Sequence, residues 1–518
     1  MCRVLPPPNQ VPTSTAFLGG AGAFRMAAVR SARSSAFICP SISAIAMVSP
    51  GFTPWTNTLR ASLCAGKLEN HAPNVASPRP AAAELRDCAA DAPMTKRRGF
   101  SLPPQANKTS FNPMQPNGRK ILAVIPLAYR NDQPFWSRDM GLLVVGLRNT
   151  GEDAKLVAIG GQDACDASLP LTLGTLSDME TPAWWQRQRP WGIILNTWSA
   201  PRYDRVRRAA LAATPRVIEK LDTDGVRSPR IWPQYYWRAT LGTYRDCGNP
   251  LKRTGAPLLT LLRAGLTWLF PSMLDRRMAA SMGMLPVVAA ESPIASARIK
   301  RFILNLNCRL PRTVTIPHPV ADEYMRIDQN VARENRIICV GRWQTYQKNF
   351  PLLIEVLTHF LAMHPAWCAD VVGPTPNRPL SIRKGTVLAR ERLLFHGRIP
   401  HRDISGLYQK SKIFFMPSRF ESFNIAAAEA LCCGCSVVGA NDVASVPFFA
   451  SQASGTGACR LTKAHLLDAL SAEMEAWSTG QRDPEKISSI WRSIVGTTAV
   501  SRLILSELEN IGPVTPHA

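Results

Sequence analysis

The sequence predicts an α/β protein with two doubly wound domains that face each other across a cleft and follow a disordered extension. Apolar runs recur along the chain with helix-like segments between them, in two successive series. The length of 518 residues is too great for one ordinary core. This alternation of strands and helices is typical of Rossmann-like domains with parallel sheets.

The N-terminal segment, residues 1–115, does not have the composition of a folded domain. It is rich in Ser, Ala and Pro and has no acidic residue before Glu69. Such a segment buries too little apolar surface to offset the entropy lost on folding. Three interpretations stay open for it: a disordered extension, a targeting segment, and a mis-assigned start with the true start at Met94 or Met114.

The first domain is predicted to begin with a strand over Lys120–Pro126, which is apolar from Ile121 onward. A continuous apolar run of this kind is typical of a parallel strand that is buried on both faces of its sheet. Ser137 is a plausible N-cap for a helix over Asp139–Asn149, and Gly151 ends that helix. Further strands are predicted at Ala154–Ile159, Trp191–Asn196, Arg216–Leu221 and Pro286–Ala290.

A second series of strands and helices follows Pro317-His-Pro319. Its strands are predicted at Arg336–Val340, Cys368–Val372, Arg392–Phe395, Ile413–Met416 and Ser436–Val438. Helices are predicted between them at Phe350–His364, Asp403–Lys410 and Ile425–Cys433. Ligands of such domains bind outside the carboxyl ends of the strands, so the loops there are the places to search for a site.

Composition limits the function classes. Hydrophobic residues make up 46% and charged residues 19%, as is ordinary for a globular enzyme. The net charge of +24 predicts attraction to anionic partners, but the charge is spread along the chain and forms no nucleic-acid-binding arm. Cys432, Cys433 and Cys435 have no zinc or disulfide spacing and are interpreted as small core residues.

One segment between the last two predicted strands of the first domain is both apolar and basic. Residues 257–270 place Leu258, Leu262, Leu266 and Leu269 at helical spacing, with basic residues nearby. Two interpretations stay open: a core-facing helix and a surface that lies on a membrane. Arg263 and Pro271 interrupt the wider apolar stretch Pro257–Leu274, which excludes it as a transmembrane helix.

A cationic loop is predicted to follow the strand that ends at Val340. Gly341 permits a sharp turn, and Arg342 and Lys348 come next, directly before the helix that starts at Phe350. A guanidinium, an ammonium and a helix N-terminus together suit a diphosphate.

A second loop carries paired carboxylates. Glu421 and Glu429 are eight residues apart, with Glu429 inside the helix over Ile425–Cys433. A rise of about 12 Å over eight helical residues lets the two carboxylates hold hydroxyls at opposite ends of an elongated ligand. The N–H groups of Phe423, Asn424 and Ile425 are helix-start donors for hydroxyl or phosphate oxygens.

The stretch Arg336–Ala440 resembles the C-terminal domain of group 1 retaining glycosyltransferases (family 4-type), which have the GT-B fold. The resemblance rests on strand-Gly-Arg…Lys, Phe395-His-Gly-Arg398, Tyr408-Gln-Lys-Ser-Lys412, Pro417-Ser418, Glu-x7-Glu and Leu431-x-x-Gly434-x-Ser-Val-Val438. It covers roughly residues 118–480 and is strong only in the second domain. It implies a nucleotide-sugar donor, with UDP, GDP or ADP as the nucleotide, and no cofactor.

The resemblance also implies roles for single residues. Arg342, Lys348 and Glu421 would be catalytic, with the two cations on the donor diphosphate and Glu421 beside the transferred sugar. The implied donor-binding residues are Gly341, Arg398, Ile399, Ser422, Phe423, Asn424, Ile425 and Glu429, with Glu429 on the ribose and Arg398 and Ile399 bordering the base. Ser422 and Asn424 stand where the family usually has Gly, which narrows the pocket.

The first domain departs further from the family. The usual Gly-rich loop is replaced by Asn131–Asp139, and Asp222 and Asp224 follow a strand where many relatives have a His. Arg138, Asp139, Asp222 and Asp224 are interpreted as acceptor-side residues. The alternative for the Asp-x-Asp pair is a Mg²⁺ or Mn²⁺ site, but no metal is expected because the donor features lie in the other domain.

The prediction is therefore a retaining transferase that moves a hexose-type sugar to a glycan, lipid-linked or small-molecule acceptor. The implied domains are an acceptor domain over 116–318, a donor domain over 319–480, and a C-terminal helix and tail over 481–518 that returns to the first domain. We expect a cytoplasmic protein with peripheral contact to the inner membrane face and no specific nucleic acid. The alternatives are another GT-B enzyme (epimerase or phosphorylase) and a non-catalytic basic module for anionic polymer or membrane.

Overall fold

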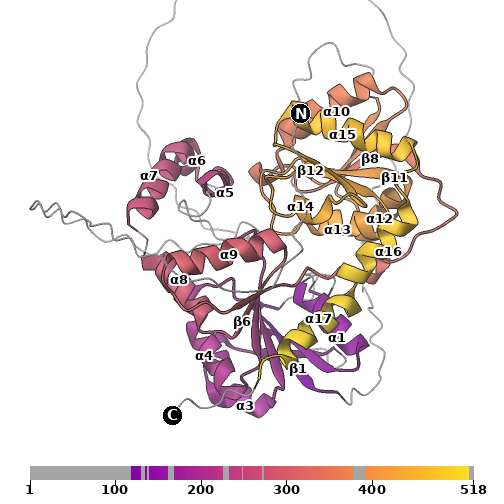
Figure 1. Ribbon diagram of the computed structural model, residues 1–518. Helices are drawn as coiled ribbons and strands as arrows, with labels where there is room; N and C mark the ends of the chain where they lie inside the picture. The colour runs from indigo at the N-terminus through magenta and orange to yellow at the C-terminus, as the bar shows by residue number, and fades with distance from the viewer. Residues whose placement is uncertain are drawn as a thin grey trace, which may run out of the picture. The chain divides into compact units, whose positions relative to one another are not determined.

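The computed structural model describes residues 118–129, 135–136, 139–160, 169–225, 233–247, 249–270, 273–376 and 391–512. Predictions for residues 1–115, and for Arg138, lie outside these residues. Asp139 begins a helix, but its side chain is also outside what the structure describes. The described chain forms two lobes, each built on one parallel sheet (Figure 1). This confirms the α/β class and the two doubly wound sheets.

The first lobe contains a seven-stranded parallel sheet in the order β3-β2-β1-β4-β5-β6-β7. Its central strand β1 is buried along most of its length, as the apolar run predicted. The strands are β1 (Lys120–Ala128), β2 (Asp153–Ile159), β3 (Leu171–Gly174), β4 (Gly192–Leu195), β5 (Val217–Leu221), β6 (Val287–Ala290) and β7 (Arg312–Thr315). The edge strands β3 and β7 escaped prediction because they are short and carry few apolar residues.

The helices of this lobe connect successive strands. They are α1 (Asp139–Asn149), α2 (Leu176–Met179), α3 (Pro182–Gln188), α4 (Asp204–Ala213), α5 (Pro233–Arg245), α6 (Pro250–Thr254), α7 (Ala256–Leu269), α8 (Met273–Gly283) and α9 (Pro293–Asn305). Four of them, α5 to α8, lie within the single crossover from β5 to β6. Within the described residues, no helix has the length and hydropathy needed to span a bilayer.

The second lobe has six parallel strands in the order β10-β9-β8-β11-β12-β13. They are β8 (Glu334–Val340), β9 (Cys368–Val372), β10 (Leu393–Gly397), β11 (Ser411–Met416), β12 (Ser436–Ala440) and β13 (Gly455–Ala458). The strand β13 was missed because it contains two glycines. The helices that follow β8 along the chain are α10 (Phe350–Met363), α12 (His401–Lys410), α13 (Ile425–Cys432), α14 (Val446–Phe449), α15 (Lys463–Ser478), α16 (Pro484–Val495) and α17 (Thr497–Glu509).

The core of the second lobe contains the three clustered cysteines. Cys432, Cys433 and Cys435 are fully buried among the apolar side chains of α13, α16 and β12. Burial raises the pKa of each thiol, in the case of Cys435 to about 11. They therefore pack as small hydrophobic side chains.

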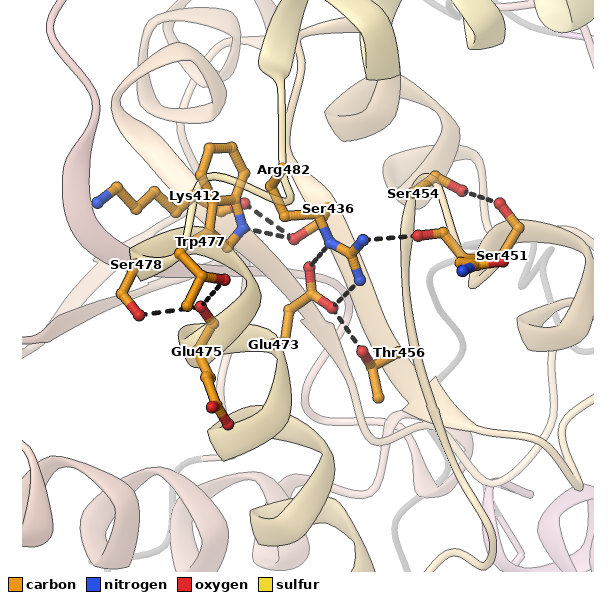
Figure 2. Close-up of polar contacts among 12 residues, drawn as sticks. Lys412, Ser436, Ser451, Ser454, Thr456, Glu473, Glu475, Trp477, Ser478 and Arg482 are labelled. Atoms are coloured by element: carbon orange, nitrogen blue, oxygen red, sulfur yellow. Dashed lines mark hydrogen bonds and ion pairs between the residues drawn. The ribbon is translucent and has the colours of Figure 1, made fainter. Parts of the chain in front are cut away.

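The carboxylate of Glu473 on α15 is held by a buried ion pair with Arg482 and by a hydrogen bond from the edge strand β13 (Figure 2). Arg482 binds Glu473 through two nitrogens, at 2.6 and 2.8 Å, and Thr456 of β13 donates to the same carboxylate at 2.6 Å. Nearby, the indole N–H of Trp477 donates to Ser436 of β12 at 2.8 Å. The bidentate ion pair and the hydroxyl donor together satisfy the Glu473 carboxylate. Burying this charge without such partners would destabilise the fold.

The last two helices pack on different lobes. Helix α16 packs against α13, and α17 packs against α1, with Gly496 between them. Val500, Ile504 and Leu508 of α17 belong to the same buried cluster as Ile121 of β1. Gly146 of α1 allows this close approach, since a Cβ there would lie 2.4 Å from the Ser501 hydroxyl oxygen.

Candidate active site

The candidate site lies where the second sheet changes direction. From β8 the chain continues outward to β9 and β10, whereas from β11 it continues the other way to β12 and β13. The loops after β8 and β11 therefore flank the switch point, where doubly wound sheets bind ligands. These are the two loops that the sequence predicts to carry the cations and the carboxylates.

Three glycines form the adjoining edge of the sheet. The Gly341 N–H donates to the Val372 carbonyl at 3.0 Å, and the Gly373 N–H donates to the Gly397 carbonyl at 2.6 Å. Gly373 has a φ of +112°, and a Cβ there would lie 2.0 Å from the Gly341 carbonyl oxygen. Sequence analysis missed Gly373, although it follows a buried strand in the same way as Gly341. Because Gly373 has no side chain, the backbone of the loop that begins at Gly341 can pass this close to it.

Lys348 and Glu421 form an ion pair across the two loops. The Lys348 Nζ atom lies 2.6 Å from Glu421 Oε1, and Gln347 donates from Nε2 to Oε2 at 3.1 Å. Glu421 is buried, and the stem of Lys348 passes the bare Cα of Gly341, where an added Cβ would lie 3.3 Å from Lys348 Cδ. An ammonium has three donors, so two N–H groups of Lys348 remain for phosphate oxygens.

Arg342 does not join this pair. Its side chain is exposed and makes no hydrogen bond or ion pair within the part of the chain that the structure describes. Its carbonyl accepts from the Thr345 N–H at 3.0 Å and the Thr345 hydroxyl at 2.9 Å, which closes a turn before η4 (Tyr346–Lys348). The turn leaves the guanidinium donors available to an anion arriving from solvent.

The start of α13 supplies backbone donors. Asn424 adopts a left-handed conformation with φ of +71° as the N-cap, and its side chain does not cap the helix. In the described chain, no acceptor lies within hydrogen-bond distance of the N–H groups of Phe423, Asn424 and Ile425. A helix start with open N–H groups attracts anions and hydroxyl oxygens.

Glu429 lies one turn inside α13 and is buried. The Tyr408 hydroxyl donates to its Oε2 at 3.2 Å. Burial and the Glu429 carboxylate both raise the pKa of Tyr408, so this hydroxyl stays protonated and remains a donor. Tyr408 thus orients the carboxylate, a role that the sequence did not reveal.

The structure places the acceptor-side candidates Asp222 and Asp224 in different surroundings. Asp222 accepts from the Ser422 hydroxyl at 2.8 Å and so contacts the loop that carries Glu421. Asp224 is buried, and its carbonyl accepts from Arg298 at 2.8 Å. Among the described residues, no group of three His, Cys, Asp or Glu side chains is placed to hold a metal ion.

Helix α5 of the first lobe contacts the cationic loop, which sequence analysis did not anticipate. Tyr235 and Ala239 of α5 form a small apolar cluster with Phe420 and Tyr346. Directly after α5, Asp246 accepts from the Tyr346 N–H at 2.7 Å. Since Tyr346 and Phe420 are close in sequence to Lys348 and Glu421, these contacts help to fix both loops.

Arg398 and Ile399 follow β10 directly after Gly397, which has a φ of +63°. Arg398 is exposed and Ile399 is half-buried against the core of the second lobe. They lie two strands from β8 in the sheet, with β9 between them. Their proposed contact with a base depends on where the ligand lies.

Comparison with known proteins gives the class. Residues 321–491 match the family model described as glycosyl transferases group 1, a range that includes Lys348, Glu421 and Glu429. The lipopolysaccharide core biosynthesis mannosyltransferase LpcC of Rhizobium leguminosarum bv. viciae is 27% identical over 245 residues, which are 42% of this chain and 67% of LpcC. The D-inositol 3-phosphate glycosyltransferase of Xylanimonas cellulosilytica is 36% identical over 109 residues, 20% of this chain and 25% of that relative.

A solved structure of Anabaena Alr3699/HepE in complex with UDP and glucose has a TM-score of 0.47 and 14% identity. The match covers 76% of this chain and 99% of HepE. The part of the chain that the family model matches is the second lobe, which carries the cation and carboxylate loops. Residues 321–491 therefore carry the sequence pattern of the group 1 glycosyl transferases.

Proposed function

We propose that the enzyme transfers a hexose-type sugar from a nucleotide-sugar donor to a glycan or lipid-linked acceptor with retention of configuration. The observation that carries the proposal is the Lys348–Glu421 pair at the switch point of the second sheet. One side chain suits the diphosphate and the other suits the hydroxyls of the sugar attached to it.

The leaving group sets the demands on the site. When the bond from the anomeric carbon to the diphosphate breaks, negative charge grows on the phosphate oxygens. Lys348 and Arg342 would stabilise that charge, with the N–H groups at the start of α13 as further donors. Fixed donors of this kind contribute about 2.7–4 kcal/mol each to the barrier reduction. Lys348, which its ion pair with Glu421 already holds in place, needs little rearrangement as the charge develops.

The carboxylates would position the donor. Each oxygen of Glu421 already accepts one hydrogen bond, and a carboxylate has roughly four acceptor positions. The remaining positions would accept sugar hydroxyls. Glu429, oriented by Tyr408, would accept from the ribose hydroxyls. Asp222 would lie toward the acceptor, since it contacts Ser422.

The relatives support the sugar class and the acceptor class. LpcC is a mannosyltransferase of lipopolysaccharide core biosynthesis, and the Xylanimonas relative acts in the same class of reaction. A hexose and an envelope glycan are therefore the first substrates to test. Polysaccharide biosynthesis for the cell envelope is the corresponding role.

The test begins with the purified full-length protein and a panel of UDP-, GDP- and ADP-hexoses. A donor at 100 times its dissociation constant is expected to stabilise the fold by about 2.7 kcal/mol, visible as a raised unfolding temperature. With the stabilising donor and lipopolysaccharide core oligosaccharides, proton NMR of the product reports the anomeric configuration. Inversion would refute the retaining mechanism, and stabilisation by no nucleotide sugar would refute the proposal as a whole.

A further inference from the structure

The α6–α7 hairpin of the first lobe exposes large apolar side chains to solvent. Within the described residues, every large apolar side chain that is more than 50% exposed lies between Leu251 and Met273. These nine residues, here called the apolar patch, are Leu251, Leu258, Leu261, Leu262, Leu266, Trp268, Leu269, Phe270 and Met273. So many exposed large apolar side chains within one short segment are rare in globular proteins and are typical of a surface that binds another protein or a membrane.

In an ordinary surface helix the apolar side chains are buried and the polar ones are exposed, but α7 shows the opposite arrangement. Its buried positions are small or polar: Ala256, Thr260 and Thr267. The two threonine hydroxyls are satisfied within the helix, by the Ala256 carbonyl at 2.7 Å and the Arg263 carbonyl at 2.8 Å. The helix packs against α5, and five of its leucines are more than half exposed: Leu258, Leu261, Leu262, Leu266 and Leu269. Of the two interpretations of this segment, the core-facing helix is therefore wrong.

The charges around the patch have one sign. Lys252, Arg253, Arg276 and Arg277 are exposed, and Asp275, the acidic residue of the segment 249–283, is buried. Figure 1 draws α5, α6 and α7 beside one another, in agreement with the contacts among the three helices. A leucine stripe with aromatic residues at its end and basic residues around it is typical of helices that lie at a lipid surface. There the acyl chains are apolar and the headgroups can carry negative charge.

We propose that the apolar patch docks onto a membrane that carries anionic lipid, with the leucines of α7 in the acyl boundary. The basic residues would then lie at the phosphate level, where each contributes to binding. A second copy of the chain is disfavoured as the occupant because pairing two such patches would bring the basic residues of both copies together. The inference does not depend on the proposed donor or acceptor.

Flotation of the full-length protein with vesicles tests the proposal. The protein is expected to float with mixed phosphatidylglycerol and phosphatidylcholine vesicles at low salt, and far less with pure phosphatidylcholine or at high salt. Leu262→Ser with Leu266→Ser should weaken binding at least tenfold. Lys252→Gln with Arg253→Gln should weaken it roughly thirtyfold at low salt. The matched control is Met363→Ser, an exposed apolar residue of α10 in the other lobe.

Each variant changes exposed side chains, so its unfolding temperature should match the wild type and its shift with the donor should persist. Loss of flotation with an intact donor response separates this proposal from the proposed function. Absence of vesicle binding by the wild type, or equal binding by the patch variants and Met363→Ser, would overturn it. A dimer in light scattering that Leu262→Ser with Leu266→Ser abolishes would assign the patch to a second copy instead.

Discussion

The Nζ atom of Lys348 and the Oε1 atom of Glu421 lie 2.6 Å apart, joining the loop after β8 to the loop after β11. Both side chains are largely withdrawn from solvent, at 12% and 5% exposure. The pair therefore has two effects that experiments can separate: it holds the two loops together, and it places a cation for the leaving diphosphate.

Replacing Lys348 by Ala is expected to lower the transfer rate by about 10²–10³, since one fixed donor to the developing charge is lost. It should also lower the free energy of unfolding by about 3–5 kcal/mol, because Glu421 is left buried without its cation. The double variant Lys348→Ala with Glu421→Ala should regain much of the stability and none of the activity. Lys300→Ala, which changes an exposed lysine of α9, is the control. Full activity of Lys348→Ala would remove this residue from the mechanism.

Glu429→Gln should weaken donor binding about tenfold or more, because a hydrogen bond to a charged acceptor contributes about 1.5–3 kcal/mol. Tyr408→Phe removes the group that orients the carboxylate and should have a smaller effect in the same direction. Titration calorimetry with the donor identified by thermal shift measures both. Glu475→Gln, on the exposed side of α15, should leave the affinity unchanged (Figure 2). An affinity equal to wild type in Glu429→Gln would exclude this residue from the donor site.

Gly373→Ala is expected to destabilise the second lobe and impair donor binding. The new Cβ would lie 2.0 Å from the Gly341 carbonyl oxygen, and the φ of +112° disfavours any side chain. Such strain costs at least about 1–3 kcal/mol and displaces the loop that leads to Lys348. Chemical denaturation measures the change. Gly406→Ala on α12, where a Cβ meets no atom within 4 Å, should instead be neutral or stabilising by about 0.5–1 kcal/mol.

The buried thiols should resist alkylation. Burial raises the pKa of Cys435 to about 11 and raises those of Cys432 and Cys433 as well. At pH 8 the thiolate fraction of Cys435 is then on the order of one in a thousand, far below that of a free cysteine. Peptide mapping after iodoacetamide treatment of the native protein should show label on the exposed Cys459 and none on these three. Rapid labelling of Cys435 below the unfolding temperature would contradict the buried packing.

Arg207 should stabilise the first lobe in a pH-dependent way. Burial alone would raise the pKa of Glu219, but the Arg207 ion pair at 2.9 Å and hydrogen bonds from Thr197 and Ser199 outweigh it, so its pKa is lowered. The stabilisation is therefore present at neutral pH and is lost as the pH falls toward and below the ordinary carboxyl pKa.

Arg207→Leu is accordingly expected to cost about 3–5 kcal/mol at neutral pH, because Glu219 becomes a buried unpaired carboxylate. The loss should shrink in acid, where that carboxylate takes up a proton. Arg205→Leu, an exposed arginine on the same helix, should change stability little. Denaturation curves at several pH values compare the three proteins. A cost for Arg207→Leu that does not change with pH would contradict the assignment.

The central strands of both sheets followed from apolar runs, because a strand buried on both faces has no polar alternation. The edge strands β3, β7 and β13 did not, since short strands with glycine or polar residues lack that pattern. The loops bearing Lys348 and Glu421 were predicted because strand-end motifs are local in sequence. Tyr408 and Gly373 were missed because their roles depend on contacts between residues distant along the chain.

Helix α7 shows a further limit of sequence reasoning. Its leucine spacing specifies an amphipathic helix but not which face meets the protein. Ala256, Thr260 and Thr267 face inward only because α5 offers a surface that accepts small side chains. The direction of an apolar face is decided by its neighbours, and periodicity alone does not contain that information.

The return of α17 to the first lobe has a consequence for biosynthesis. Val500, Ile504 and Leu508 belong to the same core as Ile121, so the amino-terminal sheet lacks part of its cover until residues 500–508 have emerged from the ribosome. The whole second sheet, β8 to β13, is synthesised after the first sheet and before α17. Nascent chains stalled before Thr497 should accordingly depend on chaperones for an otherwise finished amino-terminal half.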